Sequence, residues 1–199
     1  MKDVTASMSE ELQRILKLFD LHNVAYLLFK CEHILGGQNK NMDVLFRNND
    51  DYNNASRLLE GEGYVLYMDE FVEKYKKMYL FFDGKTVSAI HLHREVAWHG
   101  VVALDKKKMF ERAQGKIPST EDSLLIHSAH ALFENFKGKE YHRALLEKYK
   151  EEAKDWNYID CQLSEFGWKK SFYRFLQRFS VNSRIIVEAY GGRLRREPL

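Results

Sequence analysis

The sequence predicts an α/β fold, in which a mixed sheet flanked by helices is followed by a C-terminal helical unit. Up to about residue 116, short apolar runs of strand length alternate with amphipathic helical segments. From Thr120 onward, the apolar residues recur only at helical spacing. A proline-containing break at 116–119 separates the two patterns. We therefore expect an α/β domain over residues 1–116 and a helical domain over residues 117–199.

Two helices are expected in the first domain before its last strands. Ser7 and Glu10 form a capping-box pattern ahead of apolar residues on one helical face, which predicts a helix over 9–22. A second helix is expected after residue 50, with Asp50 or Asp51 as its N-cap and two glycines at its end.

Five apolar runs of the first domain have the length and composition of strands. They cover residues 24–29, 42–46, 64–68, 77–82 and 86–93. Asp83 and Gly84 lie between the last two runs and predict a tight hairpin turn.

The rest of the chain is expected to be helical. A short helix is expected to begin within 104–110 and to end before Pro118. Further helices are expected to include residues 124–136, 144–149, 168–179 and 183–189.

Composition excludes several classes of protein. With 45% apolar and 14% aromatic residues in 199, the chain has the composition of a folded domain rather than a disordered one. Its longest apolar run, 24–29, is far shorter than the roughly 20 residues of a membrane-spanning helix. The N-terminus has no apolar signal-peptide region. Two cysteines cannot form a disulfide framework, which favours a reducing compartment. Taken together, these features lead us to expect a cytoplasmic protein without a membrane partner.

The C-terminal end is basic. From residue 169 onward the net charge is +6, whereas residues 1–168 carry −4. The basic residues are Lys169, Lys170, Arg174, Arg178, Arg184, Arg193, Arg195 and Arg196. Such a segment suits a nucleic acid or another polyanion, and the alternative is a solvated helix face.

Asp43 is a candidate metal ligand because it interrupts an apolar strand. A buried carboxylate is costly unless it is paired, hydrogen-bonded or bound to a metal. Asn41 lies two residues earlier and therefore on the same strand face, so the two oxygen-bearing side chains suit Mg²⁺ with substrate phosphates. The alternative is an edge-strand aspartate that points into water.

Two pairs of histidines are candidate ligands for a transition metal. His91 and His93 share one face of a predicted strand, and His127 and His130 share one face of a predicted helix. The alternative for the helical pair is ordinary packing in an apolar helix.

The arrangement resembles the DNA polymerase β-like nucleotidyltransferase superfamily, and most closely its uncharacterised stand-alone bacterial and archaeal branch. In that branch a strand ends in a Lys-Gly-like pair, an Asp-h-Asp strand follows, and an Ile-Asp-Leu-His-like strand comes later. The corresponding stretches here are 29–31, 41–45 and 90–93, and the resemblance extends over about residues 10–150.

The resemblance implies an NTP substrate and Mg²⁺ or Mn²⁺ as cofactor. The superfamily uses three carboxylates around two metal ions. Asn41, Asp43 and His91 stand at the three carboxylate places, with His93 as a further metal ligand. The phosphate-binding pair corresponds to Lys30 and Cys31, and Gly36 and Gly37 offer a displaced turn.

Three functions follow from these features. The first is a divergent nucleotidyltransferase that moves a nucleotidyl group from an NTP to an unknown acceptor. The second is a pseudoenzyme, a catalytically degenerate nucleotide- or nucleic-acid-binding module that uses Lys30, residues 106–108 and the C-terminal arginines. The third is a transition-metal-binding protein built on His91 and His93, with His127 or His130 as a further candidate ligand.

Overall fold

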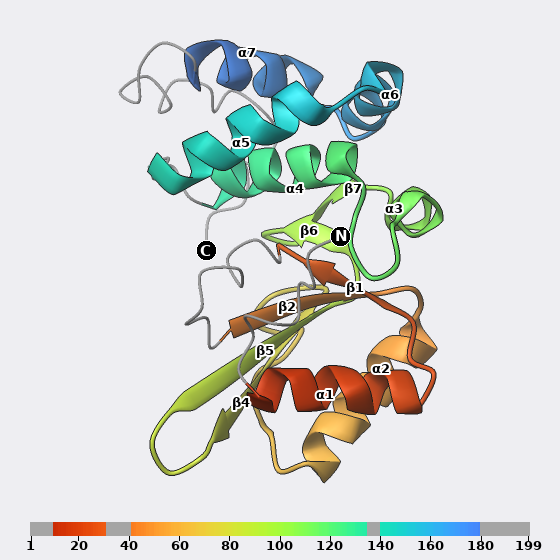
Figure 1. Ribbon diagram of the computed structural model, residues 1–199, viewed down its shortest axis with the longest axis vertical. Helices are drawn as coiled ribbons and strands as arrows, with labels where there is room; N and C mark the ends of the chain where they lie inside the picture. The colour runs from red at the N-terminus through yellow and green to blue at the C-terminus, as the bar shows by residue number, and fades with distance from the viewer. Residues whose placement is uncertain (1–9, 31–40, 135–139, 180–199) are drawn as a thin grey trace. The chain divides into compact units, whose positions relative to one another are not determined.

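The computed structural model describes residues 10–30, 41–134 and 140–179, and for 140–144 and 178–179 it describes the backbone alone (Figure 1). These residues form two compact units. The first takes in the chain up to Glu95 together with Lys106–Pro118, and the second takes in Val96–Asp105 and the chain from Ser119 onward. Residues 96–105, which the sequence analysis assigned to the first domain, thus cluster with the second unit.

The first unit contains a five-stranded mixed sheet, as expected. Its strands are β1 (Tyr26–Phe29), β2 (Asn41–Phe46), β3 (Val65–Met68), β4 (Lys76–Phe82) and β5 (Val87–His93). Their order across the sheet is β1-β2-β5-β4-β3. β2 and β5 are parallel, and the other neighbouring pairs are antiparallel. The two strands that carry Asp43 and His91 are therefore adjacent, although they lie far apart in the sequence.

Helices α1 (Glu10–Leu21) and α2 (Asn49–Gly61) pack against one face of this sheet (Figure 1). The shared core includes Ile15 and Phe19 from α1, Leu59 from α2 and Val44 from β2, all fully buried. Each such side chain contributes about 1.5–3 kcal/mol of hydrophobic stabilisation. Since side chains alternate along a strand, the residues next to Val44 point to the opposite face.

The N-cap of α2 is Asn48, so the prediction of Asp50 or Asp51 is wrong. The backbone of Asn48 is extended, and its side chain accepts a 2.8 Å hydrogen bond from the backbone N–H of Asp51. Asp51 instead accepts from the backbone N–H of Ala25, 3.0 Å away. Its carboxylate thus ties the helix to the segment before β1.

The hairpin predicted at Asp83 and Gly84 is confirmed. The backbone N–H of Asp83 donates to the carbonyl of Thr86, and the Asp83 carboxylate accepts from the backbone N–H groups of Lys85 and Thr86. Gly84 has φ +91°, a conformation that favours glycine.

Helix α3 (Lys106–Arg112) and the segment after it complete the first unit. Gly115 has φ +68° and turns the chain after α3. The carbonyl of Lys116 then accepts a 2.8 Å hydrogen bond from the backbone N–H of Leu28. This contact satisfies a donor at the open edge of β1.

In its described part, the second unit combines a short hairpin with four helices. They are β6 (Val96–Trp98), β7 (Val101–Leu104), α4 (Thr120–Phe133), α5 (Glu140–Glu152), α6 (Trp156–Glu165) and α7 (Lys169–Phe179). The hairpin and α6 were not predicted, and the helix expected over 183–189 lies outside the described residues.

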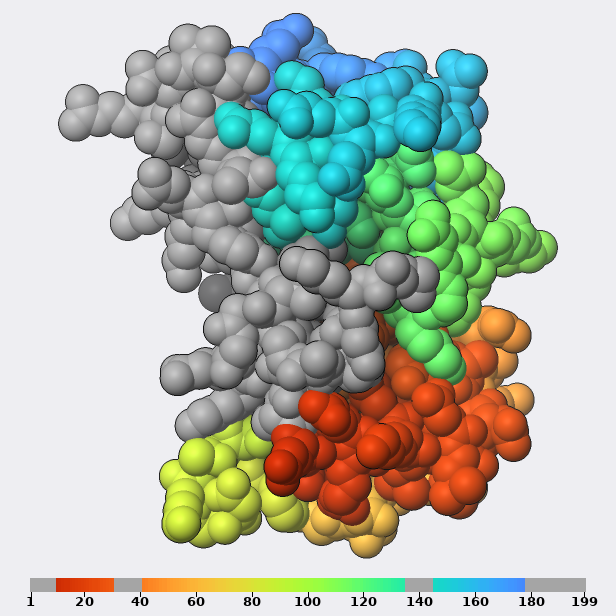
Figure 2. Space-filling model, in the orientation of Figure 1, coloured from red at the N-terminus to blue at the C-terminus, as the bar shows by residue number. Residues whose placement is uncertain are grey.

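α4 is buried along almost its whole length, whereas the outer faces of α1 and α5 reach the surface (Figure 2). Within the described ranges, no helix combines the length and apolarity needed to cross a membrane.

Candidate metal centre

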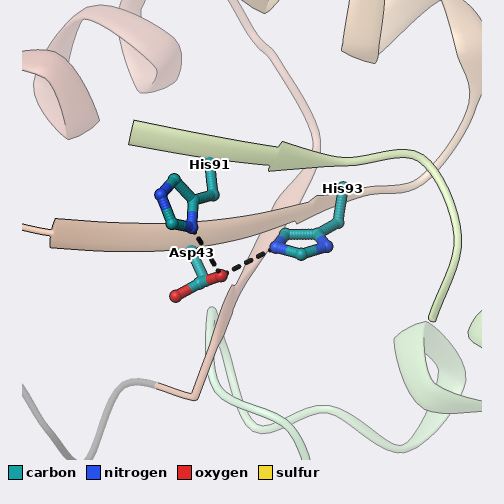
Figure 3. A group of neighbouring side chains, drawn as sticks. All are labelled: Asp43, His91 and His93. Carbon is teal, nitrogen blue, oxygen red and sulfur yellow. Dashed lines mark hydrogen bonds and ion pairs between the residues drawn. The ribbon is translucent and has the colours of Figure 1, made fainter. Parts of the chain in front are cut away.

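Asp43, His91 and His93 come together on the sheet face opposite α1 and α2 (Figure 3). The parallel register pairs Asp43 of β2 with His91 of β5, and His93 follows two residues later on the same face. His93 Nε2 lies 2.7 Å from Asp43 Oδ1, and His91 Nδ1 lies 3.3 Å from the same oxygen. We call these three residues the Asp43 cluster.

Lys30 is the fourth polar residue at this place. It follows β1 directly, and the antiparallel register puts Phe29 opposite Asp43. Its backbone has φ +58°, and its ammonium Nζ lies 3.4 Å from Asp43 Oδ1. The Lys30 side chain is only 8% exposed and also contacts the ring of Phe29, 5.2 Å from its centroid. Lys30, His91 and His93 therefore all contact the same oxygen of Asp43, while Figure 3 shows the other oxygen, Oδ2, directed away from both imidazoles.

The Asp43 carboxyl is held in its ionised form. Burial opposes ionisation, but the Lys30 charge and the hydrogen bonds from His91 and His93 outweigh it. The pKa of Asp43 consequently lies well below its usual range. An ionised carboxylate accepts hydrogen bonds only, so each imidazole donates to it.

His93 is neutral near pH 7. Burial lowers its pKa to about 4, against the raising influence of its hydrogen bond to Asp43. The side chain is 5% exposed, and its ring packs 4.9 Å from that of Phe29. Neutral imidazole is the form that binds metal ions. For Nε2 to act as a ligand, the proton that it donates to Asp43 would have to be carried by Nδ1 instead.

The geometry of the Asp43 cluster approaches that of a metal site. One ligand atom from each residue lies within 4.8 Å of the other two. Two ligands of one tetrahedral ion, with bonds of about 2.1 Å, lie about 3.4 Å apart, so the widest pair of the cluster would have to move closer when an ion binds. One carboxylate oxygen with two imidazole nitrogens is a donor set typical of Zn²⁺, Fe²⁺ or Mn²⁺.

The same donor set does not fit a pair of Mg²⁺ ions. Mg²⁺ prefers oxygen ligands in octahedral geometry, and the Asp43 cluster supplies a single carboxylate. Asn41 begins β2, is exposed, and pairs in register with Ala89. It stands on the same face as Asp43 but is not a member of the cluster.

The structure leaves three predicted nucleotide-binding residues untested. Cys31, Gly36 and Gly37 lie outside the described residues, and Lys30 is the member of that set that can be placed. Its role as counter-ion of Asp43 was missed by sequence reasoning. A single lysine at a strand end carries no signal of such a pairing, which depends on the register of β1 with β2.

His127 and His130 belong to α4 in the second unit, and each has its own surroundings there. The His127 ring stacks on Tyr149 at 5.7 Å, with an interplanar angle of 12°. His130 Nδ1 lies 2.8 Å from a carboxylate oxygen of Glu134. This arrangement favours packing over metal binding for the helical pair.

The basic residues are divided between paired and exposed positions. Lys106 contacts Glu95 at 3.0 Å and donates to the carbonyl of Arg94, and Lys169 contacts Asp160 at 2.7 Å. Lys170 and Arg174 are exposed on α7. The arginines at 184, 193, 195 and 196 lie outside the described residues.

The chain matches no known protein-family model, and no curated protein is significantly similar to it.

Proposed function

We propose that the Asp43 cluster binds one divalent transition-metal ion and that the protein is a divergent nucleotidyltransferase-like protein in which this ion holds the phosphates of an NTP. The observation that carries the proposal is the convergence of Asp43, His91 and His93 from two strands that are remote in sequence. Three potential ligands on adjacent strands of a rigid sheet form a preorganised site.

The chemistry of the ligands favours a transition metal over Mg²⁺. Two of the three donors are imidazole nitrogens, which bind Zn²⁺, Fe²⁺ and Mn²⁺ more readily than Mg²⁺. Two neutral ligands and one carboxylate also leave a bound divalent ion with a net positive charge. An anionic substrate such as a triphosphate offsets that charge.

The nucleotidyltransferase part of the proposal draws on three features. Helices cover one face of a mixed sheet, and the other face carries the Asp43 cluster. The order of helices and strands along the chain is the one on which the resemblance described above rests. Lys30 adds a cation beside the site. When bound, the metal polarises phosphoryl oxygens and stabilises charge on the leaving pyrophosphate. In that reaction the acceptor oxygen would bond to the α-phosphorus of the NTP while the bond from that phosphorus to pyrophosphate breaks, and the acceptor's proton would pass to water.

A second candidate is a binding module without transferase activity. The specific observation in its favour is that Lys30 already neutralises the one carboxylate of the cluster. Exposed Lys170 and Arg174, one helical turn apart on α7, add a small basic surface suited to a polyanion such as a nucleic acid. This module would bind nucleotides or nucleic acids with little dependence on a metal.

Metal content and calorimetry distinguish the two candidates. The protein, purified without added metal, is analysed for bound Zn, Fe and Mn, and then titrated with each NTP in the presence of Mn²⁺, Mg²⁺ or EDTA. We expect bound transition metal, NTP binding that is stronger with Mn²⁺ than with Mg²⁺, and loss of both in Asp43→Ala.

The matched control is Asp50→Ala, which removes an exposed carboxylate from α2. It should retain metal and nucleotide binding. NTP binding that persists in EDTA and in Asp43→Ala would support the binding module instead. Absence of bound metal and of NTP binding under every condition would contradict both candidates.

A further inference from the structure

The charges around Asp43 are balanced in the absence of a metal. The ammonium of Lys30 lies 3.4 Å from Oδ1 and matches the charge of the carboxylate. All four side chains are largely shielded, with exposed fractions between 5% and 19%. A divalent ion bound to Asp43 would leave two uncompensated positive charges in this partly buried space, an arrangement that is costly unless an anion accompanies it.

Lys30 and the ion would also compete for the same atom. Lys30, His91 and His93 all contact Oδ1 of Asp43, and an ion held by the two imidazoles and this oxygen would lie close to the ammonium. Two like charges at a few ångströms repel strongly in a partly buried site. Lysine has a flexible four-carbon stem, so the ammonium can turn from Oδ1 to another anionic partner nearby.

We propose that Lys30 couples metal binding to oxyanion binding, so that the Asp43 cluster binds its metal more tightly together with a phosphate-type anion than as a bare ion. This inference rests on the proposed function and specifies its ligand. The anion needs one oxygen for the metal and another for the displaced ammonium. Phosphate and phosphate esters present several oxygens in a compact tetrahedral group and meet this requirement.

The coupling makes a reciprocal prediction. If phosphate strengthens the binding of Mn²⁺, then Mn²⁺ must strengthen the binding of phosphate by the same factor. Without phosphate, the ammonium weakens metal binding by occupying Asp43. With phosphate, the same ammonium contributes a favourable contact.

Lys30→Met tests the coupling, because methionine keeps a similar unbranched length and removes the charge. The affinity for Mn²⁺ is measured in the full-length protein by electron paramagnetic resonance of the free ion, with and without inorganic phosphate. We expect Lys30→Met to bind Mn²⁺ about tenfold more tightly than wild type without phosphate. Phosphate should strengthen Mn²⁺ binding about tenfold in wild type and by a smaller factor in the variant, which keeps only the direct contact between phosphate and metal. Lys30→Arg keeps the charge and should retain the phosphate effect.

Lys17→Met is the matched control, since Lys17 is exposed on α1, which packs on the other face of the sheet. It should behave as wild type, and thermal unfolding of each variant verifies that it is folded. Equal Mn²⁺ affinity in wild type and Lys30→Met, or the same phosphate effect in both, would overturn this inference and leave the metal site intact. Absence of Mn²⁺ binding in all of these proteins would overturn the metal site as well.

Discussion

The protein carries two pairs of closely spaced histidines, and the two pairs have different surroundings. His91 and His93 on β5 both contact one oxygen of Asp43, which the neighbouring parallel strand supplies. His127 and His130 on α4 have separate neighbours, the ring of Tyr149 for one and Glu134 for the other. One pair therefore forms a cluster around a shared carboxylate, and the other is part of the packing of a buried helix.

This difference shows that histidine spacing alone does not identify a metal site. Both spacings put the two rings on one face of their element. What distinguishes the pair on β5 is an ionised carboxylate in register on the adjacent strand. The predictions below test whether the two pairs differ in function as they differ in structure.

The largest difference is expected in metal affinity. Replacing both His91 and His93 by alanine removes two of three ligands, so the affinity for Zn²⁺ or Mn²⁺ should fall at least about 100-fold, or about 2.7 kcal/mol. His130→Gln should leave it unchanged. Competition with a chromophoric chelator measures both affinities, and equal losses in the two variants would contradict the assignment.

The second difference is expected in stability, where the histidines of α4 should matter more than those of β5. His127 is almost fully buried and stacks on Tyr149, so His127→Ala should lower the free energy of unfolding by about 2 kcal/mol. His91 is 19% exposed, and His91→Ala should cost less than about 1 kcal/mol. Urea denaturation in EDTA measures both values. A larger loss of stability for His91→Ala than for His127→Ala would contradict the assignment of His127 to packing and of His91 to metal binding.

The third prediction concerns pH. The pKa of His93 is about 4 in the folded protein and near 6.5 in the unfolded chain, so the unfolded chain binds more protons between these values. Stability of the metal-free protein should therefore fall by about 2–3 kcal/mol as the pH is lowered from 6.5 to 4.

His93→Gln should make the free energy of unfolding depend less on pH between 6.5 and 4. Below pH 4, where the lowered pKa of Asp43 matters, the stability of the variant should still fall as the pH is lowered. There the unfolded Asp43 takes up a proton before the folded one, so stability also falls with decreasing pH. Denaturant midpoints measured at several pH values provide the test. Identical profiles for wild type and His93→Gln would show that His93 does not contribute.

The smallest effect is expected for the contact between His130 and the exposed Glu134. Glu134 is 43% exposed, so its contact with His130 is screened by solvent. Glu134→Gln should change the free energy of unfolding by less than about 1 kcal/mol. A loss above about 2 kcal/mol in urea denaturation would show that the contact between His130 and Glu134 makes a major contribution to stability.

Much of the fold follows from local patterns in the sequence. The apolar runs predicted all five strands of the sheet, and the Asp-Gly pair predicted the hairpin between β4 and β5. The hairpin of β6 and β7, whose strands have three and four residues, was missed. Its turn residues, His99 and Gly100, both have positive φ, so the His-Gly pair between two apolar runs was the available signal.

The N-cap of α2 and the helix α6 show two further limits. Asn48, Asp50 and Asp51 are all capping residues by type, and the structure uses the first because Asp51 is engaged with Ala25 across the fold. Asp155 caps α6 by accepting from the backbone N–H of Tyr158. Its signal was present in the sequence but stood before a helix of weak apolar periodicity.

The candidate site was predictable as a set of residues but not as an arrangement. Asp43 was singled out because a carboxylate in an apolar strand is costly, and His91 and His93 were singled out because they share one face of a strand. Their contact depends on the pairing of β2 with β5 and on its register, which a shift of one residue would destroy. The contact of Lys30 with Asp43 depends in the same way on β1, so the counter-ion emerged only from the structure.

The most direct test of the central claim is pulsed electron paramagnetic resonance of the protein loaded with substoichiometric Cu²⁺, which detects imidazole nitrogens around the ion. We predict modulation from two imidazoles in wild type, from one in either His91→Gln or His93→Gln, and from two in His130→Gln. Modulation that is absent from wild type, or that persists unchanged in both His91→Gln and His93→Gln, would contradict a metal site at the Asp43 cluster.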